Sequence, residues 1–369
     1  MKIAMIGHKR IPSREGGVEL VVGELSKRMA AAGHDVTAYN RRGKHVSGGE
    51  TVNVSEYEGV HIKSVPTFEN GKLNAMVYSV IASFMALFGR YDVIHYHAEG
   101  PSAMLWLPKL FGKRVVVTIH GLDWQRAKWG GFATRYLKFG EKMAAKHADE
   151  VIVLSENVRG YFKNKYGRDT VFIPNGVDTH DYEPPEIIAE KYGLKENSYI
   201  LFLARIVPEK GLHYLIDAYR QLDTEIKLVI AGGVSHSYEY AEEIKKQAEG
   251  DDRIIFTGFV EGKELWELFS NTRVYVLPSD VEGMPLTLLE AMGCGTECLV
   301  SDIPETKNVI LDYGMTFEKG NVNDLRQKLT AILAAPKRDT SEQIEYIREN
   351  YSWDTVTERT LEIYNSRGN

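Results

Sequence analysis

The chain has 369 residues, more than one hydrophobic core usually holds and close to the size of two domains. Its composition, 43% hydrophobic and 26% charged, is typical of a globular protein and excludes a low-complexity or disordered one. Residues 1–185 carry 25 Lys and Arg against 19 Asp and Glu, whereas residues 186–369 carry 20 against 32. The basic first half has two open explanations: an anionic partner, such as a phospholipid surface or a lipid diphosphate, or scattered solvated charge.

The chain starts directly with an apolar run, Lys2–Ile6, and no secretory signal precedes it. We therefore expect the fold to begin at residue 1 and the protein to be cytoplasmic. The longest uncharged stretch, residues 73–89, has 17 residues, and a membrane span needs about 20 mostly apolar residues. We expect a buried helix there. Cys294 and Cys298 have no His or Cys companions, so we expect reduced, structural thiols.

Short β-branched runs alternate with longer helical patterns along the whole chain. In the first half these runs are Lys2–Ile6, Asp35–Tyr39, Asp92–Tyr96, Val115–Ile119, Glu150–Leu154 and Val171–Ile173. In the second half they are Tyr199–Ala204, Ile226–Ala231, Ile254–Phe256, Arg273–Leu277 and Glu297–Ser301. Near-continuous apolar strands separated by helices predict parallel sheets covered on both faces. The expected fold class is therefore α/β, with two doubly wound domains facing across a cleft.

The domain boundary is expected within Asp178–Glu190, where His180, Asp181, Pro184 and Pro185 interrupt any regular pattern. This assigns residues 1–180 to the first domain, expected to bind the acceptor, and residues 181–352 to the second, expected to bind the donor. A last helix in residues 353–369 is expected to cross back and pack on the first domain. No internal repeat of 20–50 residues is visible, which excludes solenoids and propellers.

Residues that follow the strands are candidates for the site, because ligands of doubly wound sheets lie at the carboxyl ends of the strands. In the first half these residues are His8, His97, His120, Ser155 and Asn175, and in the second Arg205, Gly232, Gly258 and Ser279. A histidine at a strand end is also common as a hydrogen-bonded residue without catalytic duty. We regard His120 as the functional candidate and His8, His95 and His97 as weaker ones.

The segment 279–290 has the features of a diphosphate site. Gly283 permits a tight turn, and Pro285 suits the first position of a helix, where its missing N–H costs nothing. The amides of Leu286 and Thr287 would then be free at the helix start, where the dipole favours an anion. The segment therefore predicts phosphate binding.

Charged residues flank this expected phosphate site. Glu282 precedes the helix and Glu290 lies about five residues inside it, so two carboxylates would border the phosphates, each able to accept hydrogen bonds from a sugar ring. Arg205 follows one strand and Lys210 is expected to open the next helix, where both cations can neutralise a diphosphate. The alternative for Lys210 is a surface ion pair with Glu209.

These segments together resemble glycosyltransferase family 4, a large retaining family with two Rossmann-like domains of the GT-B type. Arg205–Gly211 resembles its Arg-x4-Lys-Gly signature, and Glu282–Glu290 resembles its Glu-x7-Glu signature. The match extends to Gly16–Glu19, to Asn175–Asp178 and to the final Tyr351-Ser352-Trp353. The order and spacing of these pieces cover essentially the whole chain.

The resemblance implies a role for each matched position. Glu282 would bind the donor sugar, Glu290 the ribose, and Arg205 and Lys210 the diphosphate, while His120 would lie beside the reacting sugar. The implied catalytic residues are Glu282, His120, Arg205 and Lys210. The implied donor-binding residues are Gly17, Arg205, Lys210, Phe259, Val260, Glu282, Gly283, Met284, Leu286, Thr287 and Glu290. No Asp-x-Asp pair occurs in the sequence, so we expect neither a metal nor another cofactor.

The implied reaction is hexosyl transfer from a nucleotide-diphosphate sugar to a saccharide acceptor with retention, in bacterial surface polysaccharide synthesis. The early residues are also similar to rhamnosyltransferase-like members of the family. Trp124, Trp129 and Phe132, with Arg126 and Lys128 between them, favour a lipid-linked acceptor and peripheral contact with the anionic inner face of the plasma membrane. Aromatics buried beneath a loop are the open alternative. No nucleic-acid partner is expected.

Two other functions remain as alternatives at this stage. A sugar-nucleotide epimerase or a phosphorylase would share the architecture, and a catalytically silent subunit could bind a nucleotide sugar without turnover. One segment also departs from the family pattern, because Thr296 and Glu297 stand where small or apolar residues are usual. Glu297 either affects the choice of donor or starts a strand at a solvated edge.

Overall fold

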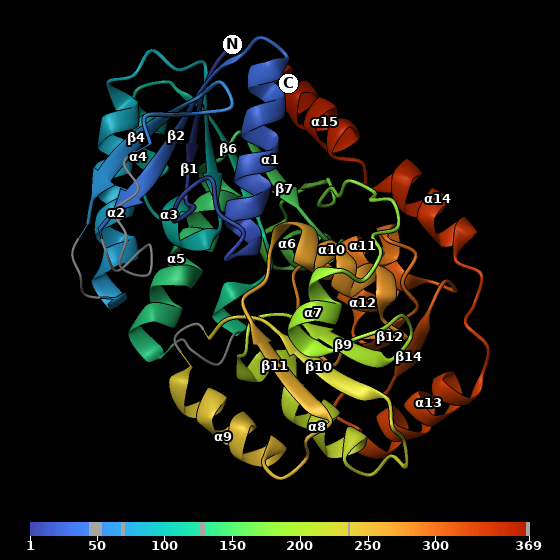
Figure 1. The fold of residues 1–369 in the computed structure, drawn as a ribbon. Coiled ribbons are helices and arrows are strands. Elements are labelled where there is room, and N and C mark those ends of the chain that lie inside the picture. Colours follow the sequence, from blue (N-terminus) through green and yellow to red (C-terminus); the bar gives the residue numbers. More distant parts are fainter. Residues whose placement is uncertain (44–53, 68–70, 126–129, 235–236, 367–369) are drawn as a thin grey trace. The chain divides into compact units, whose positions relative to one another are not determined.

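The computed structural model describes residues 1–43, 54–67, 71–125, 130–234 and 237–366. The chain forms two compact units, which we describe separately (Figure 1). Unit 1 comprises Met1–Gly176 and Trp353–Asn369, and unit 2 comprises Val177–Ser352. The division falls after Gly176, where the sequence analysis expected it after residue 180, and the last helix belongs to unit 1.

Unit 1 contains an eight-stranded sheet in the order β3-β4-β2-β1-β5-β6-β7-β8. Its strands are β1 (Lys2–Ile6), β2 (Asp35–Arg42), β3 (Glu56–Tyr57), β4 (Val60–Pro66), β5 (Val93–His97), β6 (Arg114–Ile119), β7 (Glu150–Val153) and β8 (Val171–Phe172). Its helices are α1 (Gly17–Ala31), α2 (Gly71–Leu87), α3 (Glu99–Ser102), α4 (Trp106–Leu110), α5 (Gly131–His147), α6 (Glu156–Tyr166) and α15 (Trp353–Asn365). All strand pairs are parallel except β3 with β4, which is antiparallel.

Unit 2 contains a six-stranded, fully parallel sheet in the order β11-β10-β9-β12-β13-β14. Its strands are β9 (Tyr199–Leu203), β10 (Lys227–Ala231), β11 (Ile254–Gly258), β12 (Val274–Leu277), β13 (Cys298–Ser301) and β14 (Met315–Phe317). Its helices are α7 (Ile187–Tyr192), α8 (Leu212–Tyr219), α9 (Tyr238–Ala248), α10 (Gly262–Asn271), α11 (Leu286–Gly293), α12 (Pro304–Ile310), α13 (Val322–Ala334) and α14 (Ser341–Asn350).

The architecture confirms the predicted α/β class with two doubly wound, Rossmann-like units. Each of the eleven expected strands is present, with bounds that differ by a few residues at most. Three strands were missed, β3, β4 and β14, and the antiparallel pair of β3 and β4 departs from the purely parallel sheets that we expected.

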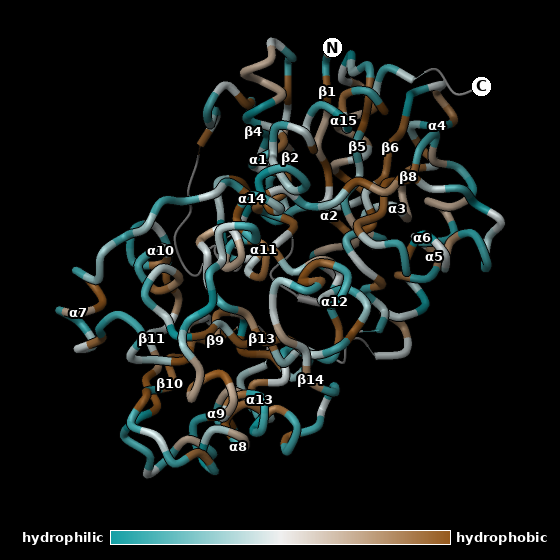
Figure 2. Tube along the Cα trace, turned by 90° about the vertical axis from the view of Figure 1, so that its right-hand side faces the viewer, coloured by the Kyte–Doolittle hydropathy of each residue, from teal (hydrophilic) through white to brown (hydrophobic). Residues whose placement is uncertain are grey.

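The cores of both units lie where the apolar strands predict them. β5, β9 and β12 are buried along their whole length, and β6 and β10 run through brown, hydrophobic colour in Figure 2. Strands buried on both faces have no polar side to alternate with, which explains their continuous hydrophobic runs. Cys294 and Cys298 carry free thiols, and Cys298 is buried in the core of unit 2.

The uncharged stretch 73–89 forms most of α2, but the expectation of a buried helix holds for one face only. Tyr78, Ala82 and Ala86 are fully buried in the core of unit 1. Phe84, at a different angle around the same helix, is exposed. Among the residues that the structure describes, no helix combines the length and the apolar character needed to cross a membrane.

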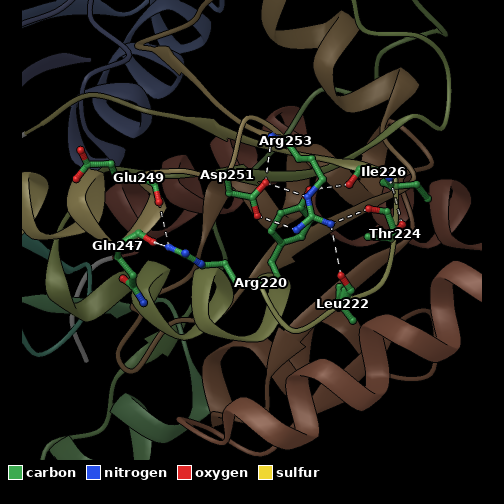
Figure 3. Close-up of polar contacts among 9 residues, drawn as sticks. Arg220, Leu222, Thr224, Ile226, Gln247, Glu249, Asp251 and Arg253 are labelled. Carbon is green, nitrogen blue, oxygen red and sulfur yellow. Dashed lines mark hydrogen bonds and ion pairs between the residues drawn. The ribbon is translucent and has the colours of Figure 1, made fainter.

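A network of arginines fixes the loops at the amino ends of β10 and β11 (Figure 3). The guanidinium of Arg253 donates to both carboxylate oxygens of Asp251, at 2.9 and 2.7 Å, and to the carbonyl oxygen of Thr224 at 2.7 Å. It also lies 5.0 Å from the ring centre of Tyr219, at the end of α8. The network therefore fixes the start of two strands whose opposite ends carry candidate site residues.

Candidate active site

The loop between β12 and α11 carries much of the expected donor site. Ser301 donates to the carbonyl oxygen of Ser279 at 2.5 Å, and the Ser279 hydroxyl donates to Glu282 Oε1 at 2.6 Å. Gly283 is buried and Met284 is half-buried beside the core. The two serine bonds fix the Glu282 carboxylate at the carboxyl ends of β12 and β13. Ser279 is thus a site residue to which the sequence analysis gave no role beyond its strand-end position.

The start of α11 differs by one residue from the prediction. Pro285 is not the first helical residue but the one before it, with φ −74° and ψ 108°. Its carbonyl oxygen accepts from the N–H groups of Leu288 and Leu289, at 3.1 and 3.3 Å. Leu286 and Thr287, the first two residues of α11, have no preceding helical turn to which their amides could donate. The helix start therefore presents N–H groups and the positive end of the dipole, as an anion requires.

Lys210 and Glu282 form an ion pair although 72 residues separate them in the chain. The two side chains are only 14% and 7% exposed, so water screens this pair less than a surface one. Gly211 makes the approach of the two loops possible: its φ is +66°, and a Cβ atom would lie 1.9 Å from the carbonyl oxygen of Pro278. Lys210 is thus a largely buried cation next to a candidate site carboxylate, whereas the alternative expected a surface pair with Glu209.

Arg205 and Lys210 both belong to the segment between β9 and α8. Arg205 follows the end of β9 by two residues and is half-buried. Lys210 ends a short 3-10 turn, Pro208–Lys210, and does not open α8 as we predicted. The left-handed conformation of Gly211 separates the turn from the helix, and this is the physical reason for the difference.

The remaining donor-site candidates of unit 2 lie within α11 and directly after β11. Glu290 is the fifth residue of α11, as expected, and is 6% exposed. Phe259 follows β11 and is 49% exposed. Val260 is buried in the core. The structure places all these residues in one unit, at the carboxyl ends of its strands or in helix starts that follow them.

Gly17 and His120 belong to unit 1. Gly17 is the first residue of α1, and the Glu19 carboxylate accepts from the Lys9 N–H at 2.8 Å. Burial alone would raise the pKa of Glu19, but the hydrogen bond from Lys9 and the nearby charges of Lys9 and Arg41 outweigh it and lower the pKa. An ionised Glu19 therefore supports the loop between β1 and α1, a role that the sequence analysis did not assign.

Three histidines that we regarded as weaker candidates lie buried in the same unit as His120. His97 Nδ1 lies 3.0 Å from His120 Nε2, and His95 contacts the Tyr364 hydroxyl at 2.6 Å. Burial lowers the pKa of His8 to about 4 and, with the charge of His120, that of His95 to about 3. Burial and the neighbouring histidines hold the pKa of His97 well below 6.5. His120 therefore packs against a neutral imidazole.

The aromatic and basic loop after His120 is only partly described. Arg126, Lys128 and Trp129 lie outside the described residues. Trp124 packs inside unit 1: its indole N–H donates to Glu141 Oε2 at 2.8 Å, and Lys138 lies 4.3 Å from the ring centre. For Trp124 the structure thus supports an aromatic packed in the fold, whereas Phe132 is exposed.

The structure contradicts one of the two roles that we considered for Glu297. It is 3% exposed, so the solvated-edge interpretation is wrong, and its carboxylate pairs with Arg273, which is also buried. Arg273 immediately precedes β12 and Glu297 immediately precedes β13, so the pair lies at the amino ends of these strands. The candidate donor-site residues follow the carboxyl ends, so the pair lies at the opposite ends of these strands.

The sequence matches two family models that together span most of the chain. The model described as Glycosyltransferase Family 4 matches residues 15–181, and the model described as Glycosyl transferases group 1 matches residues 185–350. The chain belongs to glycosyltransferase family 4. It is an enzyme that transfers a glycosyl group and uses a nucleotide sugar.

Among curated relatives, this family 4 chain is similar to a GDP-mannose-dependent alpha-(1-6)-phosphatidylinositol monomannoside mannosyltransferase of Mycolicibacterium smegmatis. The two are 26% identical, and the alignment covers 96% of each chain. A D-inositol 3-phosphate glycosyltransferase of Xylanimonas cellulosilytica is 25% identical over 95% of this chain and 91% of its own length. Relatives of this family thus match the chain over nearly its full length.

Solved structures show that the family 4 chain has the GT-B fold. Sucrose-phosphate synthase of Thermosynechococcus elongatus superposes with a TM-score of 0.84, at 21% identity and 98% coverage of both chains. HepE of Anabaena, solved in complex with UDP and glucose, gives a TM-score of 0.83 at 17% identity and full coverage of both chains. At these identities the likeness concerns the fold alone.

Proposed function

We propose that this glycosyltransferase is a retaining, metal-independent hexosyltransferase that acts on a lipid-linked saccharide acceptor in bacterial surface polysaccharide synthesis. The donor is a nucleotide-diphosphate hexose bound by unit 2. Arg205 and Lys210 bind its diphosphate, Glu282 the hydroxyls of the transferred sugar, and Glu290 the ribose. The Phe259 ring stacks on the base. His120 is the catalytic candidate that unit 1 contributes to this proposal.

The ion pair between Lys210 and Glu282 at the start of α11 is the observation that carries this proposal. A diphosphate sugar presents an anion directly beside neutral hydroxyl donors, and this pair presents a cation directly beside an acceptor of hydrogen bonds. The Lys210 ammonium has three N–H donors, so it can bind Glu282 and a phosphate oxygen together. The amides of Leu286 and Thr287 add donors for the same phosphate.

The proposed reaction breaks the bond between the anomeric carbon and the phosphate oxygen, and the electron pair leaves with the nucleotide diphosphate. Arg205, Lys210 and the α11 amides stabilise the charge that develops on this leaving group. The acceptor hydroxyl oxygen attacks from the face that the phosphate leaves, and its proton passes to a phosphate oxygen. Attack on that face retains the anomeric configuration and needs no protein nucleophile.

Two observations support a lipid-linked acceptor. The relative from Mycolicibacterium smegmatis is named for a phosphatidylinositol monomannoside, which is a glycolipid, and its alignment covers 96% of this chain. Residues 1–185 also carry a net positive charge, whereas the remainder is acidic. A basic unit next to a lipid diphosphate or an anionic leaflet gains electrostatic attraction.

The decisive experiment measures hydrolysis of UDP-, GDP- and dTDP-hexoses, including dTDP-rhamnose, by the wild type and by Lys210→Ala and Glu282→Gln. We expect one donor class to be hydrolysed, and each substitution to lower kcat/KM at least ~100-fold, the scale of losing a positioned charge contact. Glu209→Gln, which changes the neighbouring carboxylate, is the matched control and should keep full activity.

Melting curves of all variants separate loss of function from loss of fold. Full activity of Lys210→Ala or Glu282→Gln would contradict the proposed roles of these residues. A folded wild type that hydrolyses none of the donors would favour the alternative of a silent subunit that binds a nucleotide sugar. EDTA should leave turnover unchanged, because side-chain cations neutralise the leaving group. The anomeric proton coupling of the product, measured by NMR, tests retention.

A further inference from the structure

An apolar surface of unit 1 has no role in the donor site or in the proposed chemistry. It is formed by one stripe on α2 and by α4 with the residue after it, and the two helices pack against each other (Figure 1). We name it the α2–α4 surface and define it by its exposed side chains: Val80, Phe84, Phe88, Trp106, Leu110 and Phe111.

These side chains project where an ordinary surface would be polar. Phe88, Leu110 and Phe111 are 83%, 73% and 63% exposed. Val80 and Phe84 on α2 and Phe88 directly after it recur every four positions, and so do Trp106 and Leu110 on α4, so each helix turns one apolar stripe outward. Scattered single apolar residues are normal at a surface, but a contiguous cluster of this kind marks a contact site.

The centre of the α2–α4 surface is hollowed into a groove. The groove has a volume of about 440 Å³ and is lined by Phe84, Leu87, Phe88, Leu107, Phe111 and Lys113. All of its lining is apolar apart from Lys113, whose ammonium donates to the carbonyl oxygen of Gly89 at 3.4 Å. An apolar groove with one cation at its rim has the chemistry to bind an acyl chain with an anionic headgroup.

Charge identifies the partner of this surface. The sequence has no acidic residue from 70 to 91 or from 100 to 122, the two segments that carry α2 and α4. Arg90, which follows Phe88 by two residues, is exposed, and Lys113 follows Phe111 by two. The Asp149 carboxylate pairs with Lys109 of α4. Apolar tips flanked by basic residues match an anionic bilayer surface.

A second copy of the chain fits this surface less well. A twofold contact would place the same acid-free, basic rim on both sides of the interface, where like charges repel. An anionic leaflet instead supplies the opposite charge to Arg90 and Lys113 and an apolar interior to the exposed aromatic rings.

We infer that the α2–α4 surface docks the enzyme on an anionic phospholipid bilayer, with Phe88, Leu110 and Phe111 inserted at the boundary of headgroups and acyl chains. This surface differs from the loop of Trp124 to Phe132, where the sequence suggested membrane contact. The inference rests on the proposed function in one respect: a lipid-linked acceptor explains why the enzyme needs a bilayer. Its evidence is independent of the donor site.

The test is co-sedimentation of the full chain with vesicles of phosphatidylcholine, pure or with one quarter phosphatidylglycerol, without any donor. We expect the wild type to bind the anionic vesicles only. Phe88→Ser with Phe111→Ser should weaken this binding at least ~10-fold, since two inserted aromatic rings are lost. Phe132→Ser with Phe139→Ser, a matched pair of exposed phenylalanines on α5, should change it less than ~2-fold.

A charge variant tests the inference even if the apolar variant folds poorly. Arg90→Glu should weaken binding to anionic vesicles at least ~5-fold, the effect of one basic residue near such a surface. Unchanged binding of either α2–α4 variant, or a wild type that ignores anionic vesicles, would overturn the inference. So would a wild-type dimer that Phe88→Ser with Phe111→Ser converts to a monomer. Donor hydrolysis in the same samples reports the proposed function separately.

Discussion

At the scale of residues, the order of the strands explains which candidate side chains contact one another. The pairing of Lys210 with Glu282 follows from the order of the strands, because adjacent parallel strands bring their carboxyl ends together at one edge. The contact of His97 with His120 follows the same rule, since β5 and β6 are neighbours. Sequence could name the histidines but not pair them, because strand order is set by packing across the whole sheet.

The buried histidines of unit 1 predict a loss of stability in mild acid. In the unfolded chain His8, His95 and His97 take up a proton near pH 6.5, whereas burial lowers the pKa of the first two to about 4 and about 3 in the fold. The unfolded state then binds more protons, and stability falls as the pH drops below about 6.5.

Glu99 has the opposite effect on stability as the pH falls. Burial and the nearby Asp123 raise its pKa, so the folded chain keeps a proton on Glu99 that the unfolded chain loses. Three histidines against one carboxyl leave a net loss of stability as the pH falls from about 6.5 to about 5. Urea unfolding followed by tryptophan fluorescence at several pH values measures this. Four of the five tryptophans belong to unit 1, and a flat stability from pH 7 to 5 would contradict the buried, neutral state.

At the scale of elements, the strands that sequence missed are those that the core specifies weakly. β4 alternates buried Val60 and Ile62 with exposed His61 and Lys63, so it lacks the continuous apolar run by which the others were found. β14 has three residues, and β3 has two. β3 and β14 end their sheets, and β4 lies next to the end. Strands covered on one face need fewer apolar residues, which weakens their pattern.

The buried pair of Arg273 and Glu297 predicts a large effect on stability without an effect on the donor. Glu297→Ala should lower the free energy of unfolding by ~3–5 kcal/mol, because Arg273 would keep a buried charge without its carboxylate. The KM for the donor should stay unchanged, since the pair lies at the amino ends of β12 and β13. Chemical denaturation and donor kinetics on the same protein measure both quantities.

The double variant Arg273→Met with Glu297→Leu is the informative control for this pair. Removing both charges while keeping apolar volume should restore most of the lost stability, because such replacements of buried ion pairs are often neutral. A double variant as unstable as Glu297→Ala would show that packing around β13, and not the unpaired charge, causes the loss. A raised KM for the donor in either variant would indicate that Glu297 affects the choice of donor.

At the scale of the whole molecule, the division into units does not follow the order of the chain. α15 comes directly after unit 2 in sequence but belongs to unit 1. Arg359 donates to the carbonyl oxygen of Phe172 at 2.6 Å, and the Tyr364 hydroxyl contacts His95 deep in the sheet. The family signature suggested a returning helix, whereas the partners of its side chains could be known only from the structure.

This arrangement predicts that loss of the last helix damages the unit that is farther away in sequence. A chain that ends at Ser352 loses the buried side chains of Trp353, Val356 and Tyr364, each of which stabilises by about 1.5–3 kcal/mol. The total is comparable with the entire stability of an ordinary domain. Hydrogen exchange should then show β5 and β6 losing protection while β9 and β12 of unit 2 keep it. A chain shortened only after Ser366 is the matched control and should exchange like the wild type. If the chain that ends at Ser352 keeps β5 protected, unit 1 is stable without its C-terminal helix.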